Sequence, residues 1–410
     1  MKRGRIWAGV AKVDITPDIS RIRIQLGGYN ARLNMPPQGV HDPIYARALA
    51  LEWGKQRAVI VSIDHLLVPG SLTRAVLTAT GLTPEQLFLS ATHTHSAPDS
   101  MGLNERMRFP LPGVGTFVPE FLQFTAERVA QAVREAFRGL KPAVLAIVAQ
   151  PVPKLNRNRR GRPVVDPTMT VLRVDTERGT PIGAVVVYAA HPTIYSHTMM
   201  EVSADFPGVV QSQLERALGQ GAIALFLNGA LGDVSPVADE GNTPHERVQR
   251  YGSRLAIHAL RLLRTAQRMP AFLNACQIQV RLPEARPHPA FYETAGREYK
   301  VPQSLLQQLV KQLMPETAPV SALRVGELVL VGFPGEPTSI LGLRTREVGR
   351  ELGLRYATPV ALTNEWIGYI LTPREYHTGS YEATISFNGP EAGEVIMQGV
   401  RAALQAIVGG

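Results

Sequence analysis

Two histidines lie one residue apart in the segment Thr92-His93-Thr94-His95, directly after the apolar run 87–91. Successive side chains of a strand point to opposite faces, so a strand that continues through this segment places His93 and His95 on one face at its end. Paired imidazoles suit a zinc site or a catalytic site, and strand ends in open α/β sheets often hold ligands. The alternative is that two polar residues merely terminate the strand.

Other polar clusters also follow apolar runs of the sequence. They are His191-Pro192-Thr193, Asn228 to Pro236, Pro334-Gly335-Glu336-Pro337 and Asn364 to Tyr369. Two histidines from separate strands, one carboxylate and one further oxygen donor complete an N2O2 set that suits zinc. Each cluster also has a structural interpretation: a hydrogen-bonded buried histidine, a glycine turn with capping side chains, a favourable charge at a helix N-terminus, or aromatic packing. The zinc hypothesis therefore requires that these distant segments meet in the fold.

The composition limits the kind of protein that carries these clusters. The chain has 410 residues, 45% of them hydrophobic, which predicts a globular protein with a sizeable core. Cys276 is the single cysteine, so an intrachain disulfide and a cysteine-based zinc site are excluded and any metal must be held by nitrogen and oxygen. Lys12, Asp14 and Asp18 interrupt the N-terminal apolar residues, so we expect no secretory signal and a cytoplasmic location.

The partner that we expect is a small molecule or a lipid. The net charge is +9, but the densest basic run, residues 154–162, lies in a predicted loop without interleaved aromatic residues, which disfavours nucleic-acid binding. Because no run of about 18 uncharged apolar residues occurs, we expect no transmembrane segment. Transient contact with a membrane surface stays open, as does the oligomeric state.

Strand and helix patterns alternate along the chain, which predicts the α/β class, with mixed β-sheets flanked by helices in a single large catalytic domain spanning residues 1–410. Residues 46–53 and 58–63 predict an antiparallel pair. Further strands are expected at 143–152, 169–174, 182–190, 222–227, 271–280, 321–325, 328–333 and 357–363, and helices at 71–78, 119–138, 206–218, 244–268, 303–314 and 338–352. The proline-rich segment 282–300 is the expected surface excursion or lid, and the loop 98–115 is expected to border the site.

The order and composition of the motifs point to a known family. In chain order they are Asp14-Ile15-Thr16-Pro17, Ala91 to Ser96, Asn158-Arg159, His191-Pro192-Thr193, Ser203-Ala204-Asp205, Gly232 to Pro236, Pro334-Gly335-Glu336, Tyr369 to Thr372, Glu375-Tyr376 and Tyr381-Glu382-Ala383. At these positions the chain resembles the neutral/alkaline non-lysosomal ceramidase family, zinc amidases that hydrolyse the amide bond of N-acylsphingosines. The resemblance spans residues 10–390, nearly the whole chain.

The resemblance implies a zinc site and a division of roles. His93, His191, Glu336 and Tyr369 would hold Zn²⁺, and His95 would face the substrate. A zinc-activated water would then attack the substrate carbonyl, Tyr369 or His95 would stabilise the oxyanion, and His95 would protonate the leaving amine because its ordinary pKa lies near neutrality. Replacement of His93 or Glu336 would remove the metal, whereas replacement of His95 would remove turnover alone.

Two further residues match positions of the family's active site. Arg159 matches its arginine, although the neighbouring Arg157 and Arg160 leave open which of the three side chains faces the site. Ser235 matches the serine commonly described as the nucleophile. Its role as nucleophile or as substrate contact stays open, because a metal-activated water could supply the attack.

The chain also departs from the family pattern. Full-length members carry an export signal and a C-terminal immunoglobulin-like domain, and we expect neither here, only the catalytic domain. We expect hydrolysis of an N-acyl amide, with ceramide giving a fatty acid and a sphingoid base. The alternatives are a hydrolase of another small amide, ester or lactone that uses the same site, and a catalytically silent protein that binds a lipid or a carbohydrate.

Overall fold

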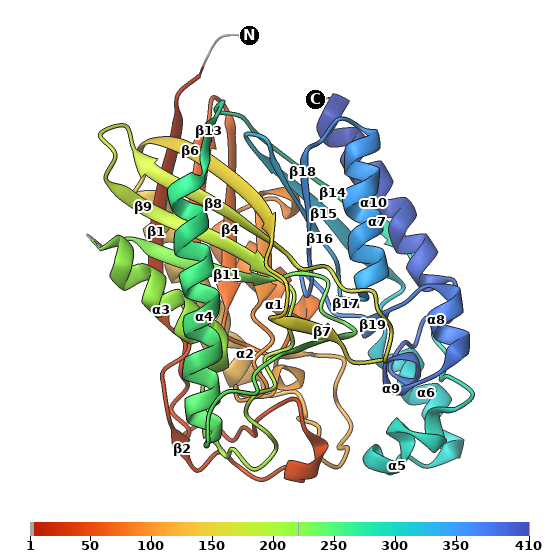
Figure 1. The fold of residues 1–410 in the computed structure, drawn as a ribbon. Coiled ribbons are helices and arrows are strands. Elements are labelled where there is room, and N and C mark those ends of the chain that lie inside the picture. The colour runs from red at the N-terminus through yellow and green to blue at the C-terminus, as the bar shows by residue number, and fades with distance from the viewer. Residues whose placement is uncertain (1–3, 220, 410) are drawn as a thin grey trace.

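Two β-sheets pack face to face in the computed structural model, which describes residues 4–219 and 221–409 (Figure 1). Within these residues the larger sheet has nine strands in the order β11-β9-β8-β6-β1-β3-β4-β5, with β13 paired to β6. Its strands are β1 (Ile6–Asp14), β3 (Tyr45–Trp53), β4 (Gln56–Ile63), β5 (Leu87–Ala91), β6 (Lys141–Pro151), β8 (Thr168–Thr176), β9 (Pro181–Tyr188), β11 (Ile223–Asn228) and β13 (Gln267–Met269). The smaller sheet, in the order β14-β15-β16-β18, contains β14 (Leu273–Arg281), β15 (Thr317–Val325), β16 (Leu328–Gly332) and β18 (Tyr356–Val360).

Nearly continuous apolar strands explain why the large sheet is covered on both faces. On β9, Val185 and Val187 belong to the core shared with the small sheet, whereas Ala184 and Val186 belong to the core under the helices. Side chains that alternate in this way bury both faces of a strand, so the sheet needs a layer on each side. The outcome is a four-layer arrangement of helices, large sheet, small sheet and helices.

The helices form the two outer layers. Figure 1 shows α3 (Asp205–Leu218) and α4 (Pro244–Thr265) side by side over the large sheet, and α1 (Gly70–Thr80) and α2 (Pro119–Arg138) cover the same face near β1 and β3. The small sheet is covered by α7 (Ser339–Glu351) and α10 (Ala392–Gly409). The predicted α/β class with mixed sheets and flanking helices is therefore confirmed.

One predicted boundary is wrong for a clear reason. The helix expected at residues 244–268 ends at Thr265, because Gln267–Met269 leaves the helix and pairs antiparallel with β6 as β13. Ala266, between the two elements, has an extended backbone. For these last residues, pairing with β6 is therefore more favourable than continuing the helix.

Short elements gather at the end of the molecule opposite both termini (Figure 1). They are η1 (Asn30–Arg32), β2 (Gly39–Val40), η3 (Ser100–Leu103), β10 (Glu201–Val202), η4 (Phe291–Glu293), α5 (Ala295–Tyr299) and α6 (Gln303–Leu313). The remaining short elements are η2 (Pro84–Gln86), β7 (Asn156–Asn158), β12 (Val234–Pro236), β17 (Glu336–Pro337), β19 (Tyr369–Ile370), α8 (Pro373–Thr378) and α9 (Tyr381–Thr384). Among the described residues, no helix combines the length and the apolar composition that a bilayer crossing requires.

Candidate metal centre and active site

His93 lies in irregular backbone after strand β5, and the predicted strand does not reach it. Strand β5 ends at Ala91, and His93 adopts a positive φ of 73°. The expectation that strand alternation aligns the two histidines is therefore wrong. Instead, the backbone N–H of His93 donates to the His65 carbonyl over 2.9 Å, and ring atom Nδ1 lies 2.5 Å from the Leu66 carbonyl. A carbonyl only accepts, so Nδ1 carries the ring proton and Nε2 presents a lone pair.

His191 presents its ring in the same way after strand β9. It is fully buried, and its Nδ1 donates to the Leu231 carbonyl over 2.8 Å, which again leaves Nε2 as an acceptor. Burial, followed by the nearby charge of Arg159, lowers the pKa of His191 to about 3. The imidazole is therefore neutral at pH 7, the form that binds a metal.

Glu336 brings a third acceptor to the two imidazoles. Pairing of β17 with β19 fixes its backbone, and Trp366 Nε1 donates to Oε1 over 3.1 Å. Its other oxygen, Oε2, lies 3.4 Å from His93 Nε2 and 3.3 Å from His191 Nε2. Within the described part of the chain, Glu336 Oε2 and His191 Nε2 are buried without a hydrogen-bond partner. Three converging acceptors repel one another unless a cation lies between them.

The spacing of these acceptors fits zinc. Tetrahedral ligand atoms at about 2.0–2.1 Å from the ion lie roughly 3.3 Å apart, and the two carboxylate-to-imidazole separations match that edge. The donor set of neutral nitrogen and carboxylate oxygen is also one that zinc accepts. The residues present therefore fit the metal that the resemblance implies.

His95 lies beside the other two histidines as a third imidazole. Its Nε2 is 3.4 Å from His93 Nε2, and its Nδ1 is 3.2 Å from the Gly28 carbonyl. One ring nitrogen from each of His93, His95 and His191 lies within 4.8 Å of the other two, so His95 can either complete a metal site or face a substrate next to it. Burial, followed by the neighbouring imidazoles, holds the pKa of His95 well below its ordinary value of 6.5.

Arg159 reaches the site through Tyr369. Its Nη2 donates to the Tyr369 hydroxyl over 3.0 Å and to the Gly232 carbonyl over 2.9 Å, while Nε donates to Glu382 Oε1 over 2.7 Å. Burial raises the pKa of Tyr369 well above its ordinary value, with a further contribution from Glu336, so the phenol stays protonated. No role had been predicted for Glu382, although it lies in one of the family motifs.

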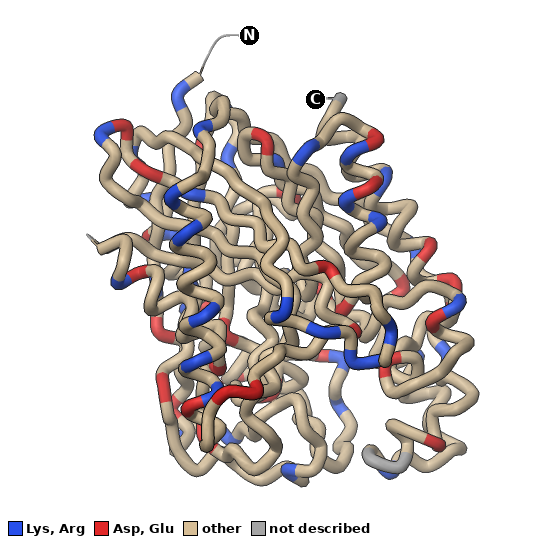
Figure 2. The backbone as a smooth tube through the Cα atoms, in the orientation of Figure 1, with Lys and Arg blue, Asp and Glu red and all other residues tan. Residues whose placement is uncertain are grey.

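The other arginines of the basic run have different partners. Arg160 donates from Nη2 to the carbonyls of Glu375 and Gly379, and Arg157 is exposed. Arg159 is thus the member of the run that the structure places against Tyr369. Figure 2 shows acidic positions close to this run, and both Arg159 and Arg160 form ion pairs with Glu382.

Ser235 lies beside the site, not in its wall. It belongs to β12, pairs with Arg157 of β7 and is half-buried. Its neighbour Val234 accepts a hydrogen bond from the backbone of His191, which brings the serine near the metal centre. Ser235 is not one of the residues that line the cleft over the histidines. The structure thus brings together His93, His95, His191, Glu336, Tyr369 and Arg159, and the role of Ser235, which like His191 and Arg159 is not among the residues lining the cleft, stays a prediction.

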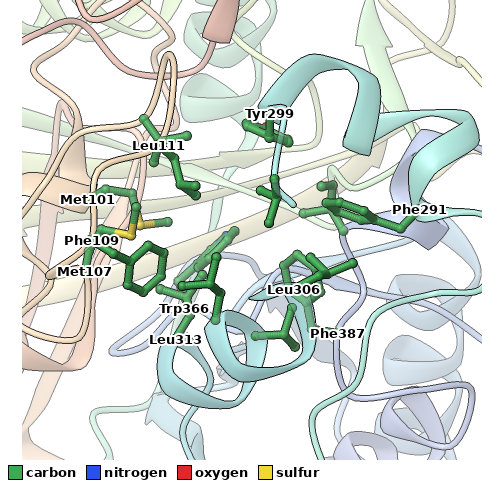
Figure 3. Close-up of a pocket in the computed structure, with 15 residues that line it drawn as sticks. Met101, Met107, Phe109, Leu111, Phe291, Tyr299, Leu306, Leu313, Trp366 and Phe387 are labelled. Atoms are coloured by element: carbon green, nitrogen blue, oxygen red, sulfur yellow. The ribbon is translucent and has the colours of Figure 1, made fainter. Parts of the chain in front are cut away.

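A cleft opens over the histidines and continues into an apolar cavity. The cleft is lined by His93, His95, Glu336 and Tyr369, with Tyr29 against the His95 ring, a contact that no sequence pattern indicated. The adjoining cavity is lined almost entirely by apolar side chains from the loop 101–114, α6 and the segment 366–387 (Figure 3). Residues shared by both linings are Met101, Val114, Tyr299, Trp366 and Ile385. The predicted role of the loop 98–115 as a border of the site is confirmed.

Comparisons with known proteins agree with this geometry. A family model described as "Neutral/alkaline non-lysosomal ceramidase, N-terminal" matches residues 7–247 and 300–398. Neutral ceramidase from Pseudomonas aeruginosa is 24% identical over 93% of this chain and 69% of its own length, and neutral ceramidase B from Dictyostelium discoideum is 23% identical over 99% of this chain and 72% of its own. The crystal structure of the Pseudomonas aeruginosa enzyme has the same fold, with a TM-score of 0.87 and 21% identity over 99% of this chain and 75% of that one.

The family match covers most of the chain and includes the segments that carry His93, His191, Glu336 and Tyr369. It leaves residues 248–299 unmatched, which contain most of α4 and all of β13, β14, η4 and α5. The resemblance inferred from the order of the motifs is confirmed: this chain belongs to the neutral/alkaline non-lysosomal ceramidase family.

Proposed function

We propose that this protein hydrolyses the amide bond of an N-acyl lipid of the ceramide class, with a zinc ion held by His93, His191 and Glu336 and with Tyr369 beside it in the wall of the cleft. The observation that carries the proposal is the convergence of His93 Nε2, His191 Nε2 and Glu336 Oε2 at 3.3–3.4 Å in a buried site. The names of the relatives support the substrate class, because the two relatives named above are neutral ceramidases.

The apolar cavity favours a lipid amide over a small polar one. It opens beside the histidines, and its lining offers little to a polar group and much to a hydrocarbon chain (Figure 3). Burial of apolar surface contributes roughly 0.8 kcal/mol per methylene group, so a chain in this cavity supplies binding energy remote from the scissile bond. Such energy holds the amide in register with the catalytic groups.

When bound, zinc lowers the pKa of a water molecule toward neutrality and polarises a carbonyl group. The residues of the protein then have to orient the substrate and transfer one proton from water to the leaving amine. Tyr369 stays protonated, so its hydroxyl can donate a hydrogen bond to the substrate oxygen on which negative charge develops. Arg159 donates to the same hydroxyl and so places a full positive charge next to Tyr369. Glu382 is a positioning residue, because it orients the Arg159 side chain.

His95 carries the proton from water to the leaving amine. Its ring is neutral at rest, so Nε2 accepts the proton that the attacking water releases as the new C–O bond forms. The same atom returns the proton to the nitrogen as the C–N bond breaks, and a fatty acid and a free amine result. The Gly28 carbonyl at Nδ1 favours the tautomer that this transfer needs.

Elemental analysis of the purified protein, together with hydrolysis of a fluorogenic N-acylsphingosine series before and after chelation, tests the proposal. We expect about one zinc per chain and fatty-acid release that chelation removes and added zinc restores. Zinc without turnover of any N-acylsphingosine would leave the metal centre and overturn the substrate class. A fully active metal-free protein would overturn the mechanism.

A further inference from the structure

A short apolar segment follows η1 and remains exposed. We call residues 33–36 (Leu33, Asn34, Met35 and Pro36) the apolar tip. Leu33 is 61% exposed and Met35 is 49% exposed, the two highest values among the large hydrophobic residues that the structure leaves uncovered in the described ranges. Adjacent exposed apolar side chains are uncommon on soluble proteins and mark surfaces that contact something else.

Hydrogen bonds hold the apolar tip firmly in place. Arg32, directly before it, is 1% exposed and donates from Nη1 to the carbonyls of Gly27 and His95 over 2.7 and 2.6 Å. Leu33 and Asn34 both adopt left-handed backbone conformations, with φ of 52° and 62°. Leucine disfavours this conformation, so the surrounding fold holds the backbone here against a local preference.

The apolar tip is also fixed to the mouth of the cleft. Asn34 Nδ2 donates to the Val114 carbonyl over 2.9 Å, and Asn34 Oδ1 accepts from the Gly113 N–H over 2.7 Å. Gly113 lines the cleft and Val114 lines both the cleft and the apolar cavity. On the other side, η1 contacts α5, which supplies Tyr299 to both linings. A surface that meets Leu33 and Met35 is therefore next to the entrance.

The segment that carries the apolar tip is basic. Residues 19–40 contain Arg21, Arg23 and Arg32 and neither aspartate nor glutamate, but Arg21 pairs with Asp18 and Arg32 is buried, so Arg23 is the arginine of this segment considered for lipid contact. Arg23 is exposed and lies in the same surface hollow as Asn34 and Pro36, whose lining also includes the buried Asp99. Exposed apolar side chains next to a basic side chain are the combination that binds the surface of an anionic bilayer, with the apolar groups among the acyl chains and the cation near the phosphates.

We infer that the apolar tip docks this protein on the surface of an anionic lipid bilayer, with Leu33 and Met35 inserted and Arg23 at the level of the phosphates. Docking in this position turns the mouth of the apolar cavity toward the lipid. The inference rests on the proposed function, because a lipid amide that resides in a membrane must pass from the bilayer into the cleft. The apolar tip then marks the side of the protein through which that passage occurs.

Sedimentation with sucrose-loaded vesicles of phosphatidylcholine and phosphatidylglycerol, free of any ceramide, tests the inference on the full chain. Burial of a leucine or methionine side chain is worth about tenfold or more in partitioning, so the double variant Leu33→Glu/Met35→Glu is expected to bind at least tenfold more weakly. The matched control Ile257→Glu/Leu343→Glu alters exposed apolar side chains on α4 and α7 and is expected to bind like the wild type. Arg23→Gln is expected to reduce binding and its dependence on salt.

Activity separates this inference from the proposed function. Hydrolysis of a water-soluble short-chain N-acyl substrate is expected to be equal in the wild type and in the Leu33→Glu/Met35→Glu variant. Equal vesicle binding by that variant and the control, or no binding by the wild type, would overturn the docking surface. Tip-dependent vesicle binding by a protein that hydrolyses no N-acyl compound would support docking and refute the proposed function alone.

Discussion

The Arg159 guanidinium donates a hydrogen bond to the Tyr369 hydroxyl over 3.0 Å across a sequence separation of 210 residues. Glu382 accepts a hydrogen bond from Nε of the same guanidinium, and although burial opposes it, the oxygens of Tyr369 and Glu382 hold the pKa of Arg159 above its ordinary value. A permanent cation thus lies behind a protonated phenol at the wall of the cleft. In a buried site such a pair stabilises developing negative charge far better than in water.

Arg159→Lys is expected to lower kcat by roughly 100-fold with little change in KM, because a lysine cannot contact Tyr369 and Glu382 with one planar group. Metal content should stay at the wild-type level. The matched control is Arg157→Lys, an exposed position in the same run, which is expected to keep full activity. Steady-state kinetics and elemental analysis check both variants, and an inactive Arg157→Lys with an active Arg159→Lys would reverse our assignment.

Metal content should distinguish variants of the metal ligands from a variant of His95, the proton carrier. His93→Ala, His191→Ala and Glu336→Gln each remove one of the three converging acceptors and are expected to lose both zinc and turnover. His95→Ala is expected to lose turnover while it keeps about one zinc per chain. A metal-free His95→Ala variant would show that His95 is a ligand, an arrangement that the clustering of the three imidazoles also permits.

Trp366 is expected to affect zinc affinity although it does not belong to the ligand set. Its Nε1–H donates to Glu336 Oε1 over 3.1 Å and so orients the carboxylate toward the imidazoles. Trp366→Phe keeps an aromatic ring in the wall and removes this donor, and loss of such a supporting hydrogen bond typically costs 10–100-fold in metal affinity. Competition with a chelator of known affinity measures the effect, and an unchanged zinc affinity would contradict the role.

The apolar cavity is expected to set acyl-chain preference. Val310 lies on α6 and lines the cavity, so Val310→Trp should fill it and raise KM for long-chain N-acylsphingosines at least tenfold, with short-chain substrates little affected. Gln308→Trp places the same side chain on the exposed face of the same helix and serves as the control. Equal chain-length profiles for the two variants would show that the lipid chain lies elsewhere.

Apolar periodicity was sufficient to predict most of the elements that carry the site. It placed strand 87–91 and helix 119–138 where they occur, because both patterns are long and uninterrupted. It missed β1, where charged residues and Gly9 break the pattern. A Cβ at Gly9 would lie 2.2 Å from the Ala136 carbonyl, so only a glycine lets α2 pack this close to β1. The sequence around Gly9 does not indicate this contact. The C-terminal helix α10 was also not predicted.

The site itself was predicted by residue type and not by local geometry. His93 faces its partners because its backbone adopts a left-handed conformation, which no alternation rule indicates for a histidine. The bond from Arg159 to Glu382 joins residues 223 positions apart, and Tyr29 contacts His95 from a segment that offered no chemical motif. Such contacts depend on how the layers assemble, so the motif order predicted the set of residues and only the fold gave their positions.

Asp205 is expected to make a contribution to the stability of the fold that decreases as pH rises from about 4 to 7. Burial, with the charge of Asp42, raises the pKa of this carboxyl from 3.8 to about 7. The folded protein therefore binds a proton in this range that the unfolded chain releases, and the loss across the range is on the order of 4 kcal/mol at most. Asp205→Asn cannot ionise, and asparagine tolerates the left-handed conformation of this residue, which has a φ of 53°.

The unfolding free energy of metal-free protein at pH 5 and pH 8, measured with urea in the presence of chelator, checks this effect. The unfolding free energy of Asp205→Asn relative to that of the wild type should increase from pH 5 to pH 8, because only the wild type must then ionise a buried group. Asp18→Asn alters an exposed aspartate whose pKa lies below its ordinary value, so it should leave the pH dependence unchanged. Parallel curves for Asp205→Asn and the wild type would mean that Asp205 is already ionised at pH 5 in the folded protein.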